Sequence, residues 1–191
     1  MADITQDETI EVIVRDSATS ANELKVNTDG SVNATPVSQD QIATDKVFVL
    51  SLSINAIVGG SDNPLILLKN PSGSGKTFRL LDIYAGCVVN NVGVEYKLFY
   101  APTITLNGTA TTPRNALIGS ATASVAQAFT LPTLAVIGTQ IGGWTNAQNT
   151  VFAHARGETL PFLQANQNLV LSAAPSSNNR AITVTLVWAE V

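Results

Sequence analysis

The stretch "KVFVLSLSINAIV", residues 46–58, decides the fold class of this chain of 191 residues. Its residues alternate between two rows, which are Val47, Val49, Ser51 and Ser53 on one side and Phe48, Leu50, Leu52 and Ile54 on the other. A period of two over this length predicts a β-strand with one well-buried face. The surrounding sequence therefore has to supply other strands against which that face packs.

Short apolar segments of the same kind follow, among them "PLILLK", "TFRLLDIYAG", "VGVEYKLFYA" and "NLVLSAA". Turn clusters such as "GGSDNP", "NPSGSG" and "SSNN" separate them, with a spacing typical of an all-β sandwich. The final segment "RAITVTLVWAEV" places Ile182, Val184, Leu186 and Trp188 on one face, which predicts a long strand inside a sheet. We predict an all-β fold, specifically a jelly-roll-like β-sandwich over residues 46–191.

No stretch carries a sustained helical stripe with caps. The best helical candidate is the alanine-rich run "ALIGSATASVAQA", residues 116–128. Gly119 and the Ser and Thr content weaken a helix there, so a strand is expected instead.

Residues 1–45 differ from the rest, because their apolar residues are isolated and polar ones dominate. The segment Thr9–Ser17, "TIEVIVRDS", alternates like one strand, and Asp29-Gly30 is a hairpin signal. Such a segment cannot build its own core. We therefore predict an extended N-terminal arm with a short hairpin, ordered by contact with a neighbour or with the main domain.

The composition is unusually poor in charge: 13% of residues are charged and 45% are hydrophobic, against about 25% charged in typical domains. A surface of this kind suits a protein packed against copies of itself or against partners. The net charge of −4 and the scattered basic residues argue against binding nucleic acid. No apolar run is long enough for a membrane span, and the acidic N-terminus resembles no secretory signal, so synthesis in a reducing cytoplasm is expected.

The motif GSGKT, within "LILLKNPSGSGKTFRLLDIYAG" (residues 65–86), superficially matches a phosphate-binding loop. Asn70 stands where that loop has its first glycine, and the residues after Thr77 alternate like a strand rather than opening a helix. We interpret "NPSGSGK" as a β-turn joining two antiparallel strands, in which Gly73 and Gly75 supply positive φ. A nucleotide-binding protein that uses Lys76 is the disfavoured alternative.

Three segments resemble small all-β virion proteins of tailed bacteriophages. They are the turn-and-strand stretch just quoted, within residues 65–100, the last twenty residues with "ITVTLVWAEV", and the arm sequence "ELKVNTDGSVNAT", residues 23–35. The resemblance implies a head decoration (cement) protein, the base of a head fibre or a tail-associated protein. It carries over no set of functional residues.

Few side chains suggest chemistry. Trp144 is expected in a Gly/Asn/Gln-rich loop, "QIGGWTNAQN", and is the best candidate for stacking on a sugar, although a loop Trp tucked under a sheet edge or into a neighbouring subunit is favoured. Asp82 and Glu95 are a candidate carboxylate pair, for which salt bridges with Arg79 or Lys97 are the favoured role. The single His154 is expected in a strand, and the single Cys87 as a small buried residue.

These observations predict a non-enzymatic virion structural protein, in particular a capsid decoration protein that stabilises the phage head. Its expected partners are copies of itself, with a trimer expected, and the major capsid protein. No catalytic residue, metal or cofactor is expected, and neither nucleic acid nor a membrane is an expected partner. The alternative is a tail- or fibre-associated protein that binds a host glycan through Trp144.

Overall fold

The computed structural model describes residues 46–87, 93–146, 153–156, 160–177 and 180–191. These residues form β-strands and no helix, so the predicted all-β class is confirmed. Contacts divide the chain into Met1–Val37 and Ser38–Val191, and all the described residues belong to the second unit. The predicted arm, residues 1–45, with its expected strand and hairpin, lies outside the described residues.

The strands are β1 (Val47–Ile57), β2 (Asn63–Asn70), β3 (Phe78–Cys87), β4 (Val94–Tyr100), β5 (Thr103–Leu106), β6 (Thr109–Thr111), β7 (Arg114–Asn115), β8 (Gln127–Thr130), β9 (Thr133–Val136), β10 (Thr139–Asn146), β11 (Ala153–Arg156), β12 (Phe162–Leu163), β13 (Gln167–Pro175) and β14 (Arg180–Glu190). Two six-stranded antiparallel sheets contain most of them. Sheet I has the order β11-β3-β14-β1-β7, with β12 also paired to β3. Sheet II has the order β10-β4-β13-β2-β8-β6, and β5 and β9 form a separate ribbon.

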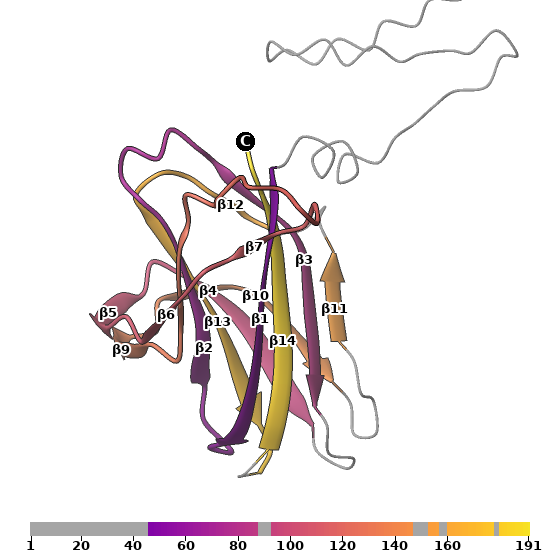
Figure 1. The fold of residues 1–191 in the computed structure, drawn as a ribbon. Coiled ribbons are helices and arrows are strands. Elements are labelled where there is room, and N and C mark those ends of the chain that lie inside the picture. The colour runs from indigo at the N-terminus through magenta and orange to yellow at the C-terminus, as the bar shows by residue number, and fades with distance from the viewer. Residues whose placement is uncertain (1–45, 88–92, 147–152, 157–159, 178–179) are drawn as a thin grey trace, which may run out of the picture. The chain divides into compact units, whose positions relative to one another are not determined.

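The two sheets pack as a sandwich (Figure 1), with the main cluster of buried apolar side chains between them. Phe48 and Leu186 of sheet I belong to the same buried cluster as Leu68, Tyr96 and Leu171 of sheet II. Each of these side chains lies on the inner face of its strand because side chains alternate between the two faces of a sheet. Burial of this apolar surface is the main stabilising contribution to the fold.

Strand β1 follows its sequence pattern closely. Leu50 is buried on the inner face, whereas Ser51 and Ser53 are exposed on the outer face. Their hydroxyls lie 2.8 and 3.0 Å from the hydroxyls of Thr185 and Thr183 on the neighbouring strand β14. The predicted strand with one well-buried face is confirmed, except that Val47, at the start of the outer row, is also buried.

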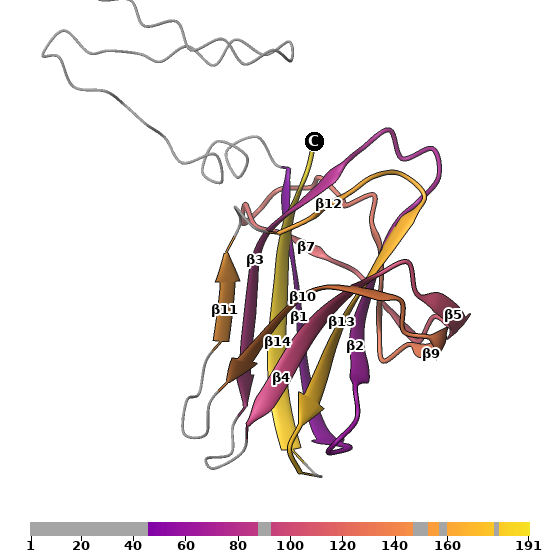
Figure 2. The same cartoon turned by 180° about the vertical axis from the view of Figure 1, so that it is seen from behind.

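Eight of the strands form four nested antiparallel pairs, in which the outermost strands along the chain pair with each other and the innermost strands do the same. These pairs are β1 with β14, β2 with β13, β3 with β11, and β4 with β10. Members of sheets I and II alternate along the chain from β1 to β4, so successive connections cross between the layers (Figure 2). The chain is thus one long antiparallel ribbon wound into a sandwich.

Sheet II contains an internal repeat that the sequence interpretation missed. The segments "FYAPTITLNGT" (residues 99–109) and "FTLPTLAVIGT" (residues 129–139) match at Phe, Pro, Thr, Gly and Thr, with equivalent positions thirty residues apart. In each copy the residue before the proline has positive φ, 51° at Ala101 and 54° at Leu131. Each copy leaves sheet II there and contributes one strand to the β5–β9 ribbon, which projects from the sandwich in both views (Figures 1 and 2).

The two copies pass each other at a pair of glycines in a reciprocal way. A Cβ on Gly108 would lie 2.2 Å from the carbonyl oxygen of Thr130, and a Cβ on Gly138 would lie 2.3 Å from that of Tyr100. Since Thr130 and Tyr100 are themselves equivalent in the repeat, the crossing has approximate two-fold symmetry. Glycine is required at both positions because any side chain would overlap backbone atoms.

The strand expected over residues 116–128 is wrong except at its end, where β8 begins at Gln127. Residues 116–126 form a loop, and the buried carboxylate of Glu190 holds it in place. One carboxylate oxygen accepts hydrogen bonds from the Ser124 hydroxyl and the Trp188 indole N–H, and the other accepts from the backbone N–H of Val125 at 3.1 Å. This side-chain anchor replaces the ladder of a strand.

Candidate functional site

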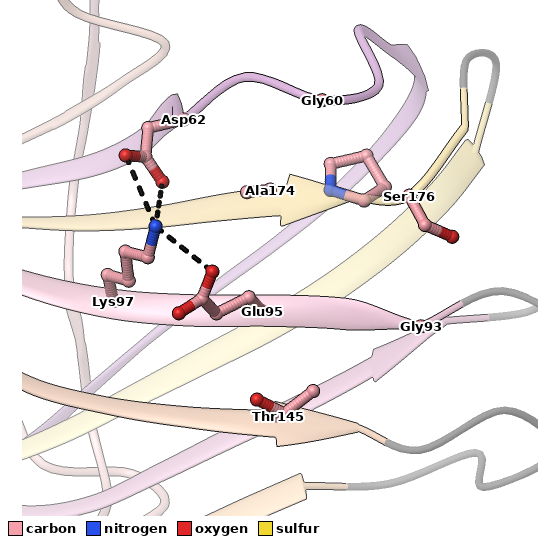
Figure 3. Close-up of a pocket in the computed structure, with 9 residues that line it drawn as sticks. Gly60, Asp62, Gly93, Glu95, Lys97, Thr145, Ala174 and Ser176 are labelled. Carbon is pink, nitrogen blue, oxygen red and sulfur yellow. Dashed lines mark hydrogen bonds and ion pairs between the residues drawn. The ribbon is translucent and has the colours of Figure 1, made fainter.

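The described residues contain an open hollow of about 390 Å³ at one end of sheet II (Figure 3). Its lining consists of Gly60, Asp62, Gly93, Glu95, Lys97, Thr145, Ala174, Pro175 and Ser176. Thr145 and Ala174 flank Glu95 on the neighbouring strands, and Gly143 stands in register beside Lys97. Because these neighbours are small, they leave room for the two long charged side chains, of which Glu95 is 48% exposed and Lys97 only 17% exposed.

Lys97 is the centre of the charged group (Figure 3). Its Nζ lies 3.0 Å from Oε2 of Glu95, 3.2 Å from Oδ1 of Asp62 and 3.4 Å from Oδ2 of Asp62. The hydrogen bond to Glu95, followed by that to Asp62, raises the pKa of the Lys97 ammonium above its usual value. The Glu95 side chain is 48% exposed, so solvent weakens its ion pair.

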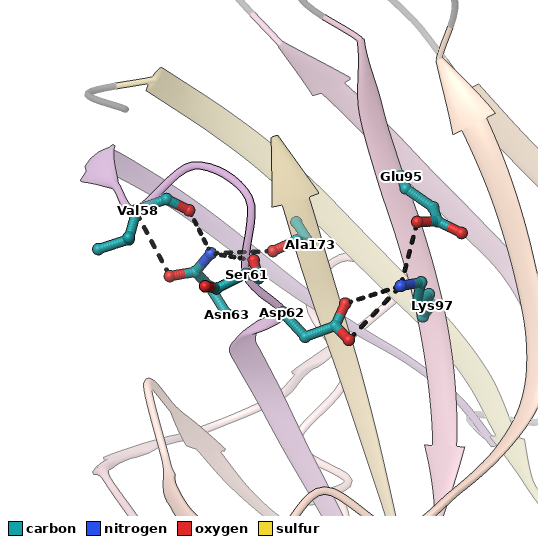
Figure 4. Close-up of polar contacts among 7 residues, drawn as sticks. All are labelled: Val58, Ser61, Asp62, Asn63, Glu95, Lys97 and Ala173. Atoms are coloured by element: carbon teal, nitrogen blue, oxygen red, sulfur yellow. Dashed lines mark hydrogen bonds and ion pairs between the residues drawn. The ribbon is translucent and has the colours of Figure 1, made fainter. Parts of the chain in front are cut away.

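Asp62 is positioned by its neighbour Asn63 (Figure 4). The two N–H groups of the Asn63 amide are shared among the carbonyl oxygens of Val58, Ser61 and Ala173, which lie 2.7, 2.8 and 3.1 Å from Nδ2. Asn63 Oδ1 also accepts from the backbone N–H of Val58 at 3.4 Å. One amide side chain thus closes the loop between β1 and β2 and fastens it to β13, which brings Asp62 over Lys97.

This arrangement limits the chemistry that the hollow can support. The ammonium of Lys97 already donates to both carboxylates, so Asp62 and Glu95 do not form the bare carboxylate pair that acid–base catalysis of glycoside cleavage uses. The lining holds no Cys or His, and no group of three or more metal-ligating side chains is found in the described part of the chain. The geometry is that of an ion-pair clamp between β4 and the β1–β2 loop.

The GSGKT stretch forms a loop around the side chain of Asn70, which is 1% exposed. The Asn70 Nδ2 donates to the carbonyl oxygens of Lys76 (2.8 Å) and Leu163 (2.9 Å), and its Oδ1 accepts from the Ser74 hydroxyl (2.6 Å). The residue that breaks the nucleotide-binding motif is therefore the residue that organises the loop.

The backbone of this loop is also committed to internal contacts. The N–H groups of Ser74 and Lys76 donate to Pro71 O and Ser74 Oγ, each at 3.2 Å, and the N–H of Thr77 donates to Val191 O at 2.9 Å. A phosphate cradle requires such amides to be available at the start of a helix, whereas strand β3 follows here. The predicted turn with positive φ at Gly73 (79°) and Gly75 (64°) is confirmed.

One part of that interpretation is wrong. Strands β2 and β3 do not form an antiparallel pair, since β2 lies in sheet II and β3 in sheet I. The loop is a crossing between the two layers. Its length and its two glycines are equally compatible with a hairpin and a crossing, so local sequence does not distinguish them.

Trp144 lies in strand β10 and not in a loop, contrary to the sequence interpretation. It is paired in register with Tyr96, and the two rings stack with centroids 5.9 Å apart. The indole is partly buried against the core, and its Nε1 is buried without a hydrogen-bond partner. One ring face is therefore covered by Tyr96, and binding of a glycan by Trp144 stays a prediction that would have to use the rest of the ring.

The remaining candidates are placed separately. Asp82 is in β3 of sheet I and Glu95 in β4 of sheet II, so the structure does not bring this carboxylate pair together, and the predicted Glu95–Lys97 salt bridge is confirmed. His154 is in strand β11, as expected, paired in register with Tyr84. Cys87 is buried, as expected for a small apolar residue.

Sequence interpretation missed Asp62, Asn63 and Glu190 as structural residues. The turn cluster "GGSDNP" indicates a structural role for Asn63, because Asn side chains often bond to the backbone of a turn. Nothing in the local sequence indicates that Asp62 contacts a lysine 35 residues later. No helix in the described residues has the length and apolar character to cross a membrane. No family model and no curated protein matches the chain.

Proposed function

We propose that the chain is a non-enzymatic virion structural protein that decorates and stabilises a bacteriophage head. The observation that carries the proposal is the strand order. The nested pairs β1 with β14, β2 with β13, β3 with β11 and β4 with β10 follow the order expected of a double-sheet jelly roll, and this order supports the proposal. Jelly rolls occur in viral capsid and lectin domains, and this support is by analogy of fold.

The surface adds a second line of support. Leu106 and Val136 occupy equivalent positions of the internal repeat on the projecting β5–β9 ribbon, and they are 63% and 57% exposed. Singly exposed apolar residues are common on protein surfaces, so the proposal uses their place on a projecting ribbon as well as their exposure. We assign this ribbon to the contact with the major capsid protein. A protein that binds only the assembled shell would stabilise that shell by mass action.

The proposal also assigns copies of the chain as partners, with the trimer expected from the sequence, and places the protein in the virion after assembly in the host cytoplasm. No reaction is part of it. The ion-pair clamp at Lys97 and the hydrogen-bonded loop at Asn70 hold surface loops in fixed positions, and such contacts suit a structural role.

The test is binding of the purified full chain to heads produced without it. The heads and the chain are sedimented together, and immunogold labelling then locates the chain on the particles. Val136→Asp is expected to reduce binding at least about ten-fold, because it places a charge in an apolar contact. Val58→Asp is the matched control, since Val58 is also 57% exposed but lies outside the ribbon. Failure of the unmodified chain to sediment with heads would overturn the proposal.

A further inference from the structure

Asn107 and Gly108 link strand β5 of the projecting ribbon to strand β6 of sheet II. They are the single Asn-Gly pair in the sequence. Both residues are exposed and lie between strands, and no turn or loop hydrogen bond holds the Gly108 N–H within the described part of the chain. The link is therefore open to water and outside the ladders of the sheets.

An asparagine that precedes glycine is prone to spontaneous loss of its side-chain amide. The backbone nitrogen of the next residue attacks Cγ of the asparagine, and glycine leaves this approach unhindered because it has no Cβ. Asn63 and Asn70, which fasten loops in this fold, precede prolines, whose nitrogen carries no hydrogen to give up. Asn107 alone has the neighbour that favours the reaction.

A lysine ammonium polarises the Asn107 amide. Lys69 Nζ donates a hydrogen bond to Asn107 Oδ1 at 2.7 Å. The same ammonium lies 5.5 Å from the ring centroid of Phe129, and this cation–π contact helps to hold it in place. A positive charge beside Oδ1 withdraws electrons from Cγ and stabilises the negative charge that the oxygen gains when the nitrogen attacks.

The crossing of the two repeated segments explains why the reactive pair contains glycine. A Cβ on Gly108 would lie 2.2 Å from Thr130 O, so a side chain that would slow the attack does not fit there. At the equivalent crossing, Gly138 follows Ile137, which has no amide. The reactive site therefore belongs to the first segment of the repeat, and the second segment shows which residue can replace Asn107.

We propose that Asn107 is a site of spontaneous deamidation and that Lys69 accelerates the reaction. The Gly108 nitrogen forms a bond to Cγ of Asn107, the bond from Cγ to Nδ2 breaks, and Nδ2 leaves as ammonia with the proton from Gly108. Water then opens the cyclic imide. Opening at Cγ gives aspartate, whereas opening at the backbone carbonyl carbon gives isoaspartate. Water is the co-reactant, and no electrons are transferred.

The two products have different consequences for the ribbon. Aspartate at position 107 places a carboxylate beside the Lys69 ammonium and adds one negative charge to the net charge of −4. Isoaspartate adds a methylene group to the main chain directly before Gly108, where the crossing has no space even for a Cβ. Formation of isoaspartate should therefore loosen the ribbon.

The first measurement is peptide mapping by mass spectrometry while the purified full chain is stored at mildly alkaline pH. The peptide with Asn107 should gain the mass difference between an amide and an acid, in separable aspartate and isoaspartate forms, whereas peptides with Asn115 and Asn168 should change far more slowly. Asn107→Ile, which copies the second segment of the repeat, should abolish the change. A wild-type peptide that keeps its amide, or that becomes cross-linked to the Lys69 peptide, would overturn the inference.

The second measurement tests Lys69 with a matched set of variants. Lys69→Met should slow the conversion at least about three-fold, Lys69→Arg should keep most of the rate because it keeps the charge, and Lys76→Met, in another loop, should leave it unchanged. In denaturing urea, where the contact is lost, wild type and the three variants should convert at one rate. A folded-state rate that Lys69→Met leaves unchanged or raises would overturn the inference, and so would a difference that persists in urea.

The third measurement is thermal unfolding. Chain stored until isoaspartate accumulates should contain a fraction with a lower Tm, whereas Asn107→Asp, which has the normal backbone, should unfold at the wild-type temperature or above it. Equal Tm values for stored and fresh chain would refute the loosening of the ribbon. None of these measurements uses heads, so the inference stands or fails separately from the proposed function.

Discussion

Replacement of Asn70 by alanine tests whether this side chain organises the loop that resembles a nucleotide-binding motif. The change removes three hydrogen bonds, to Lys76 O, Leu163 O and the Ser74 hydroxyl. At about 0.5–1.5 kcal/mol each, their loss lowers the free energy of unfolding by about 1.5–4.5 kcal/mol. Because the bond to Leu163 O is buried and that carbonyl loses its partner, we expect about 3 kcal/mol.

Urea unfolding followed by Trp fluorescence measures this loss, because Trp188 is fully buried in the core. The corresponding fall in Tm is about 6–12 °C for a domain of this size. Asn70→Asp keeps the shape but loses both N–H donors, and it should be at least as destabilising as Asn70→Ala.

Lys76→Ala is the matched control. The loop contacts described above use the backbone of Lys76 and not its ammonium, so the cost should stay within about 0.5 kcal/mol. The reasoning is refuted if Asn70→Ala costs less than about 0.5 kcal/mol, or if Lys76→Ala costs as much as Asn70→Ala. Nucleotide binding that is lost in Lys76→Ala would restore the alternative that this loop geometry disfavours.

Three further changes have defined outcomes. Lys97→Met should lower the free energy of unfolding by no more than about 1 kcal/mol at neutral pH. The pKa of Lys97 is raised in the folded state, so the ammonium stabilises the fold fully below pH 10.5 and loses this contribution as the pH rises further. The difference in stability between wild type and Lys97→Met should therefore shrink above pH 10.5. Tyr96→Phe should be neutral or stabilising by about 1 kcal/mol, since the buried hydroxyl has no partner; burial also raises the Tyr96 pKa, so wild type should lose stability relative to this variant above pH 10, where the unfolded state ionises. Gly138→Ala should destabilise as much as Gly108→Ala, and both more than Gly119→Ala, which has the same positive φ but open space around it; equal unfolding free energies for all three would contradict the crossing geometry.

Local patterns predicted those parts of the fold that depend on a single strand. The alternation of residues 46–58 was sufficient for β1 because the face of each side chain is set by its own position along the strand. The same holds for β14, whose Ile182, Val184, Leu186 and Trp188 are all buried as expected. The Glu95–Lys97 salt bridge was predictable for a similar reason, since residues two apart on a strand share a face.

Features that depend on the path of the chain were not predictable in this way. Whether β2 and β3 pair or cross between layers depends on β13 and β14, which follow some hundred residues later and take the neighbouring positions. The buried role of Glu190 depends on the loop carrying Ser124 and Val125, which has no periodicity of its own. The internal repeat is different, because its signal was present in the sequence as two Phe-x-x-Pro-Thr segments thirty residues apart.

That repeat explains why sheet II needs two glycines that no local turn rule demands. β2 and β13 pair around Leu67 and Val170, and the backbone N–H groups of Leu131 and Ala101 donate to Leu65 O and Asn168 O on either side. These contacts exchange under the same two-fold relation that exchanges Gly108 and Gly138. The approximate symmetry therefore extends from the projecting ribbon through the centre of sheet II, and a substitution at one glycine should have its counterpart at the other.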